Sequence, residues 1–190
     1  TGNYNTAVGS SALGANTTAS NNTALGYSAL YVNSTGSYNT AVGHEALTAN
    51  TTGEQNVAMG RGALIANTTA SYSVAVGDSA LTSATTGGSN TAIGSAAGLS
   101  ISTGSNLQAF GKDAARSGSP GGAATTGSNA VYIADENITA AYIQVDWTIS
   151  SDERDKTDFT ALDLGLDFVK DLAPVTYKWD KRSNYINKND

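Results

Sequence analysis

The sequence predicts an all-β protein whose main part is a parallel β-solenoid (a β-roll) of seven 17-residue rungs. Three observations carry this prediction. Glycine recurs in strict 17-residue steps, an alanine and a larger apolar residue precede each of these glycines, and a further alanine follows three residues later. The glycines are Gly9, Gly26, Gly43, Gly60, Gly77, Gly94 and Gly111. A repeat without drift in its spacing is typical of stacked units that bury a shared core.

Each rung contains two short strand-like segments, such as 5–8 and 11–13, and each segment offers one large apolar residue and one alanine. This is too little apolar surface to fold alone, so the rungs must stack. We expect every repeat glycine to occupy a sharp turn where a Cβ atom would be costly. A leucine closes the second segment in five rungs and is replaced by Gly98 and Ala115 in the last two, so the pattern decays. The five leucines are Leu13, Leu30, Leu47, Leu64 and Leu81.

A second 17-residue series lies in the turns, at Asn16, Asn33, Asn50 and Asn67. Asparagine tolerates left-handed backbone and bonds its own turn through its side chain. We therefore expect stacked Asn and Thr side chains to form hydrogen bonds from rung to rung. Each of these asparagines also begins an N-x-[ST] sequon, so N-glycosylation is the functional alternative. Turn chemistry explains the period without it.

The composition excludes several classes of function. The net charge of −6 disfavours nucleic acid and anionic membrane surfaces as partners. No apolar run is long enough to span a membrane, so we expect no membrane insertion. The chain has no cysteine, and no His/Asp/Glu cluster has metal-ligand spacing, so we expect neither a metal nor another cofactor. Thr1 falls inside a repeat, which indicates that the natural chain begins further upstream.

We predict three segments: the solenoid at 1–116, a linker and β-rich junction at 117–150, and an α+β segment at 151–190. Residues 117–128 have the Gly, Ser and Pro content of a loop. Strand-like patterns follow at 131–133 and 142–145. More than half of the charged residues lie in 151–190, where 160–172 has helical periodicity and 175–179 has a strand pattern. A thin, nearly uncharged solenoid favours a bundle. A homotrimer of chains around a three-fold axis would bury the remaining Ala, Val and Leu faces, but the residues alone do not fix the number of chains.

The repeat pattern Gly-x-x-Asn-Thr-Ala-Val-Gly-x-x-Ala-Leu resembles the head repeats of trimeric autotransporter adhesins. It is also similar to the repeats ahead of the chaperone domain in phage tail fibres. The resemblance covers residues 1 to about 115. It implies a trimeric, left-handed β-roll used in surface attachment, and an extracellular location on a virion tail fibre or a cell surface.

The C-terminal segment resembles the start of the intramolecular chaperone auto-processing domain of phage tailspikes and tail fibres. The resemblance is carried by Ser-Asp-Glu-Arg-Asp-Lys-Thr at 151–157, followed by Leu162, Gly165-Leu166, Leu172, Pro174-Val175, Tyr177 and Trp179. That domain nucleates trimer folding and then cleaves itself with a serine–lysine dyad. The resemblance implies that Ser151 is the nucleophile and Lys156 the general base, which requires a lowered lysine pKa. Asp155 replaces the usual apolar residue, and a nearby carboxylate would favour the charged lysine.

Three functional hypotheses follow. The first is a structural fibre or stalk segment, trimerised with the help of a self-cleaving chaperone. The alternative is an adhesin head that binds a host receptor or glycan, for which exposed tyrosines could stack on sugars. Enzymatic activity is limited to a single-turnover autoprotease at Ser151, because the first 111 residues hold only the acids Glu45, Glu54 and Asp78. His44, Asp135, Glu136 and Asp146 are interpreted as surface residues. The tyrosines are Tyr4, Tyr27, Tyr31, Tyr38 and Tyr72.

Overall fold

A computed structural model describes residues 2–116, 124–133 and 139. The chain divides into two compact units, Thr1–Tyr142 and Ile143–Asp190, and every described residue belongs to the first unit. The strand predicted at 142–145, the helix predicted at 160–172 and the strand predicted at 175–179 lie outside the described residues.

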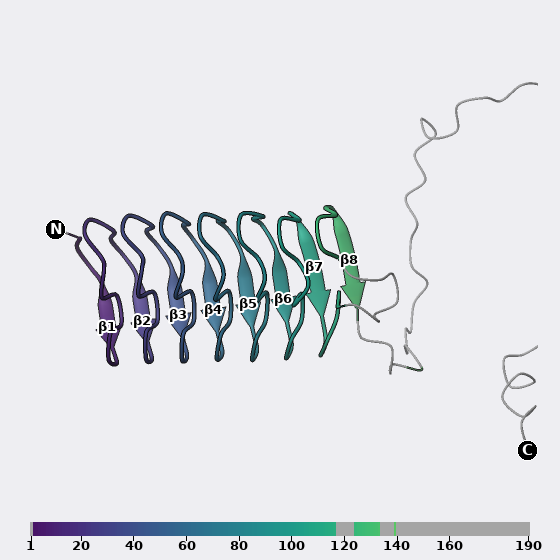
Figure 1. Cartoon of the computed structure of the whole chain (residues 1–190), viewed down its shortest axis with the longest axis horizontal. Helices are drawn as coiled ribbons and strands as arrows, with labels where there is room; N and C mark the ends of the chain where they lie inside the picture. Colours follow the sequence, from purple (N-terminus) through teal and green to yellow (C-terminus); the bar gives the residue numbers. More distant parts are fainter. Residues whose placement is uncertain (1, 117–123, 134–138, 140–190) are drawn as a thin grey trace, which may run out of the picture. The chain divides into compact units, whose positions relative to one another are not determined.

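The described residues form a β-solenoid whose eight short strands lie side by side in one parallel sheet, in sequence order (Figure 1). The predicted fold class is therefore confirmed. Every strand is an edge-to-edge neighbour of the strands before and after it in the chain, as stacked rungs require. The strands are β1 (Thr6–Val8), β2 (Thr23–Leu25), β3 (Thr40–Val42), β4 (Val57–Met59), β5 (Val74–Val76), β6 (Thr91–Ile93), β7 (Leu107–Phe110) and β8 (Ala130–Ile133).

The 17-residue period sets the register of β1 to β7, because each residue pairs with its equivalent one period later, as Ala41 pairs with Ala58. The sheet also continues past the repeat. Ala130–Ile133 pairs with Leu107–Phe110 after a step of 23 residues. The strand predicted at 131–133 is confirmed, but the sequence placed it in a junction, whereas it belongs to the solenoid sheet. The six additional residues interrupt the 17-residue period in the sequence, but β8 still pairs in parallel with the strand before it, as the other strands do.

The core is thin because each of the first five rungs offers only two alanines and one leucine to it. The middle residue of each three-residue strand, β1 to β6, is an alanine that faces the interior, as in Ala41, which is fully buried. The alanine and the leucine of the next turn, Ala46 and Leu47, are fully buried as well. Equivalent residues of successive rungs therefore stack into continuous rows. Burial of one leucine side chain per rung stabilises the solenoid by about 1.5–3 kcal/mol.

The second strand-like segment of each rung is a turn, so this part of the prediction is wrong. Ser11 and Leu13 both have left-handed backbone, with φ of 62° and 51°, and the same conformation recurs at Leu30, Leu47 and Leu64. A left-handed residue costs about 1–2 kcal/mol. Full burial of the leucine side chain offsets that cost. The leucine row therefore forms part of the core from a turn and not from a strand.

The apparent decay of the repeat is a change of core composition. Gly98 replaces the sixth leucine, and a Cβ atom there would lie 2.8 Å from Leu81 Cδ2 and 3.0 Å from Ile101 Cδ1. Ile101, which occupies the position of the turn asparagines, and Leu107 are almost fully buried. Apolar side chains thus replace the missing leucine in the last rungs, and the solenoid keeps a filled interior.

Candidate functional site

The predicted catalytic residues Ser151 and Lys156 lie outside the described residues, as do Asp135, Glu136 and Asp146. The serine–lysine site therefore stays a prediction. Within 2–116, 124–133 and 139, no group of three or more His, Asp or Glu side chains could hold a metal ion. No helix in this part of the chain has the length and apolar character of a membrane span.

Three of the four turn asparagines, Asn33, Asn50 and Asn67, form the predicted ladder in the interior of the solenoid, whereas the amide of Asn16 bonds the Ala19 carbonyl of its own turn. Asn50 Nδ2 donates to Asn33 Oδ1 at 2.8 Å, and Asn67 Nδ2 donates to Asn50 Oδ1 at 2.9 Å. Each of the two donors also bonds a carbonyl of its own turn, on Gly53 and Ala70. Asn33, Asn50 and Asn67 are fully buried, so their amide nitrogens are structural donors and not accessible glycan acceptors. This geometry supports the interpretation as turn chemistry.

A second asparagine ladder, which we did not predict, precedes the strands. Asn39 Nδ2 donates to the Gly53 carbonyl at 2.8 Å, and Asn39 Oδ1 accepts the backbone N–H of Asn56 at 3.0 Å. Equivalent bonds recur at Asn22 and Asn56. The Gly53 carbonyl accepts from both ladders, since Asn50 Nδ2 also donates to it. The available signal was the recurrence of asparagine at 17-residue steps immediately before β1 to β4, which Asn90 continues before β6.

The outer face of the sheet carries an uncharged row that we call the apolar stripe. It consists of the last residue of each strand, which follows an inward alanine in β1 to β7 and Tyr132 in β8, and its members are paired in register through all eight strands. Since side chains alternate across a strand, these residues point away from the core. Leu25, Met59 and Ile93 are 47%, 44% and 45% exposed. The stripe comprises Val8, Leu25, Val42, Met59, Val76, Ile93, Phe110 and Ile133.

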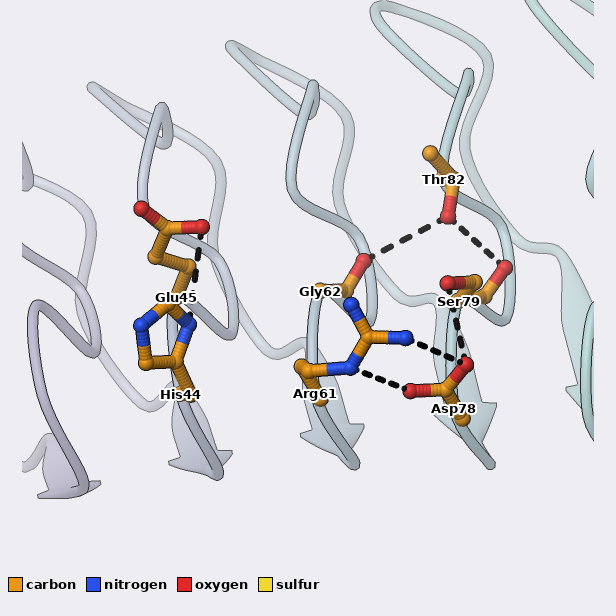
Figure 2. Close-up of polar contacts among 7 residues, drawn as sticks. All are labelled: His44, Glu45, Arg61, Gly62, Asp78, Ser79 and Thr82. Atoms are coloured by element: carbon orange, nitrogen blue, oxygen red, sulfur yellow. Dashed lines mark hydrogen bonds and ion pairs between the residues drawn. The ribbon is translucent and has the colours of Figure 1, made fainter.

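Charged and aromatic side chains lie in the turns that follow β2 to β5, and Figure 2 shows His44 beside Glu45 and Arg61 beside Asp78. The rings of Tyr27 and His44 stack with centroids 5.1 Å apart, and His44 Nδ1 lies 3.5 Å from Glu45 Oε2. Arg61 binds both carboxylate oxygens of Asp78, at 2.9 and 3.1 Å. Exposed pairs of this kind contribute at most about 1 kcal/mol. They form no convergent acid–base set, and His44 is a surface residue as predicted.

The turn that follows β7 carries a small charged cluster. Lys112 Nζ lies 3.0 Å from one Asp113 oxygen, and Arg116 Nη1 lies 2.8 Å from the other. The hydrogen bond from Lys112, followed by that from Arg116, holds the pKa of the Asp113 carboxyl below its ordinary value. The cluster therefore keeps a carboxylate charged and paired at the end of the turn, and it presents no free base for catalysis.

Comparison with known proteins agrees with the C-terminal resemblance. Residues 151–190 match a family model described as chaperone of endosialidase. No curated protein and no solved structure matches the chain. A β-solenoid followed in the sequence by a segment that matches this family model fits a tailspike-like, fibre-type structural protein.

Proposed function

We propose that the chain is a structural segment of an extracellular fibre, on a virion tail or a cell surface, in which three copies associate through the apolar stripe. The stripe is the observation that carries this proposal. Eight apolar side chains in register form a continuous outward row, and strands β1 to β8 contain no charged residue. Monomeric proteins rarely expose a continuous apolar surface without a binding role.

The surroundings of the stripe support an interface. Each repeat glycine directly follows a strand, and the residue after it is polar or charged in nearly every rung, as at His44, Arg61, Asp78 and Lys112. An apolar centre with a polar margin is the usual anatomy of a protein–protein interface. The family match at 151–190 favours three copies, because the domains that this segment resembles nucleate trimers.

A lysine placed in the stripe tests the association. In the full chain, Met59→Lys puts three positive charges into the proposed interface, where unpaired buried charges cost several kcal/mol each. We expect this variant to sediment as a monomer with an unchanged far-ultraviolet circular dichroism spectrum. Ser95→Lys is the matched control, since it adds the same charge in the exposed turn row that already carries Lys112. A Met59→Lys variant that remains trimeric would contradict the proposed interface.

We further propose that residues 151–190 assist folding and cleave the chain once. The Ser151 hydroxyl would attack the carbonyl carbon of a neighbouring peptide bond while Lys156 takes its proton. The C–N bond would then break as Lys156 returns the proton to the departing amine, and water would hydrolyse the resulting ester to a carboxylate and the free serine. Ser151→Ala should leave one band on a denaturing gel where the unaltered chain gives two. Because a carboxylate stabilises a protonated lysine, Asp155→Leu should accelerate cleavage at neutral pH. Two bands from the Ser151→Ala variant would refute the role of this serine.

A further inference from the structure

One turn position just before each strand has left-handed backbone in every rung. The eight residues at this position have φ between 54° and 62°, and all of them are exposed. Tyrosine and a smaller polar residue alternate over the first six rungs. The position comprises Tyr4, Asn21, Tyr38, Gln55, Tyr72, Ser89, Asn106 and Asn129. We call Tyr4, Tyr38 and Tyr72 the tyrosine row; its members are two rungs apart.

The tyrosines are not explained by folding. Asparagine adopts left-handed backbone readily and occupies this position in three other rungs, whereas a bulky residue there is an outlier. Burial does not offset the cost, because Tyr4, Tyr38 and Tyr72 are 85%, 61% and 62% exposed. Strained conformations with no packing benefit are typical of functional positions. The row therefore points to a ligand.

The backbone beneath the row is held in place by the neighbouring rungs. The N–H of Tyr38 donates to the Ser20 carbonyl at 3.1 Å, and that of Tyr72 donates to the Glu54 carbonyl at 3.0 Å. Since stacked strands are about 4.8 Å apart, the tyrosines recur roughly every 9.6 Å. A fixed aromatic spacing of this kind suits a ligand that is itself a regular polymer. The solenoid already holds the backbone of the tyrosines in place, so binding loses less conformational entropy.

We propose that the tyrosine row binds a neutral, extended, β-linked polysaccharide that lies along the solenoid. In such a polymer every second sugar presents the same ring face, and a disaccharide spans about the length of two rungs. Alternate sugars would stack on tyrosine rings, whose faces accept the C–H groups of a pyranose. The amides of Asn21 and Gln55 lie between the rings in the row and can bond the hydroxyls of the intervening sugars.

The neighbouring residues favour sugar over other polymers. Ser37 and Ser71 precede two of the tyrosines, and each hydroxyl accepts a backbone N–H, from Ser20 and Glu54, so its own proton can be donated to a ligand. Glu54, which precedes Gln55, is the one charged residue directly beside these turn positions, and an exposed carboxylate repels anionic glycans. The tyrosine row lies in the turns and not on the apolar stripe, so this inference stands whether or not the chain is a trimer.

The full chain should be tested by isothermal titration with cellohexaose and chitohexaose, with a hyaluronan oligosaccharide and a proline-rich peptide as competing ligand classes. The triple variant carries Tyr4→Asn, Tyr38→Asn and Tyr72→Asn. Asparagine is chosen because it occupies the same position in other rungs. The affinity of the triple variant for the neutral sugar should fall at least about tenfold. Tyr38→Phe keeps the ring and should retain binding. Tyr27→Asn removes an exposed tyrosine outside the row and should leave the affinity unchanged.

The fold of each variant is checked by its circular dichroism spectrum and its sedimentation. Neutral-sugar binding that depends on the tyrosine row and survives Tyr38→Phe would establish the proposal. Failure of the unaltered chain to bind either neutral sugar would overturn it. So would equal affinity in the triple variant, or a preference for hyaluronan or the peptide.

Discussion

Replacing Gly60 by alanine tests how closely the rungs stack. Gly60 has φ of +136°, and a Cβ atom built on it would lie 2.3 Å from the Gly77 carbonyl oxygen and 2.6 Å from its carbon. Real Cβ atoms do not approach backbone atoms to less than 3.0 Å. The alanine must therefore push one rung away from the next or rotate out of its conformation, and either change affects the backbone of both rungs.

The size of the effect follows from the bonds that hold these rungs together. The N–H of Gly77 donates to the Met59 carbonyl and that of Gly60 to the Val42 carbonyl, both at 2.8 Å. Loss of two such bonds costs about 1 kcal/mol each. The backbone conformation adds about 1–3 kcal/mol for a residue other than glycine. We therefore expect Gly60→Ala to lower the free energy of unfolding by about 3–5 kcal/mol.

Gly62→Ala is the matched control because it lies in the same rung. Its φ of +65° is also left-handed, but a Cβ atom there meets no atom within 4 Å. The equivalent residues Ser28 and Glu45 adopt the same conformation. This control should change the free energy of unfolding by less than about 1 kcal/mol. Urea unfolding followed by circular dichroism measures both variants, and equal losses would refute the argument from rung contact.

Three further predictions concern the core, the ladder and the charged turn. Asn50→Ala removes a buried amide and leaves the asparagine oxygen of the preceding rung without its donor, so it should cost about 1–3 kcal/mol in urea unfolding. Leu64→Ala opens a cavity in a fully buried row and should cost about 2–5 kcal/mol in the same assay. Lys112 and Arg116 lower the folded-state pKa of Asp113. The charged carboxylate therefore contributes to stability above its ordinary pKa of 3.8, and this contribution is lost as the pH falls through the folded-state pKa. Asp113→Asn should remove this part of the acid dependence of the melting temperature, and an unchanged acid dependence would contradict it.

The regular part of the fold could be predicted from the 17-residue period. A strict period requires equivalent residues to pair, which fixes the register of β1 to β7 and the stacking of the turn asparagines. The period also predicted that positions such as Gly60 require glycine, and in the structure each of these turns lies directly against the equivalent turn of the next rung.

The direction of the strand side chains could not be predicted in the same way. A strand of three residues is too short for alternation to reveal the inner face, and the small residue, Ala41 in β3, proved to be the one inside. Val42 therefore points outward, although its type suggests a core residue. The leucine turns were missed because left-handed leucine is rare, and only stacking makes it favourable.

Two features of the candidate surfaces left signals in the sequence that were not used. Gly104-Ser105-Asn106 recurs as Gly127-Ser128-Asn129, which indicates the eighth rung, and Asn106 Nδ2 donates to Asn129 Oδ1 at 2.8 Å. The tyrosine row has a period of two rungs, so a comparison of single rungs does not show it. The predicted pair Ser151 and Lys156 stays a prediction from resemblance.

Chemical cross-linking through a single cysteine tests most directly whether the apolar stripe faces another copy of the chain. The sequence has no cysteine, so Met59→Cys introduces a unique thiol in the middle of the stripe. If three stripes meet around one axis, mild oxidation of the full chain should join two of every three copies into a disulfide-linked dimer. Tyr38→Cys, in an exposed turn, should remain uncross-linked at the same protein concentration. A Met59→Cys chain that stays monomeric on a non-reducing gel, and sediments with the 19.2 kDa mass of one copy, would contradict the proposed trimer.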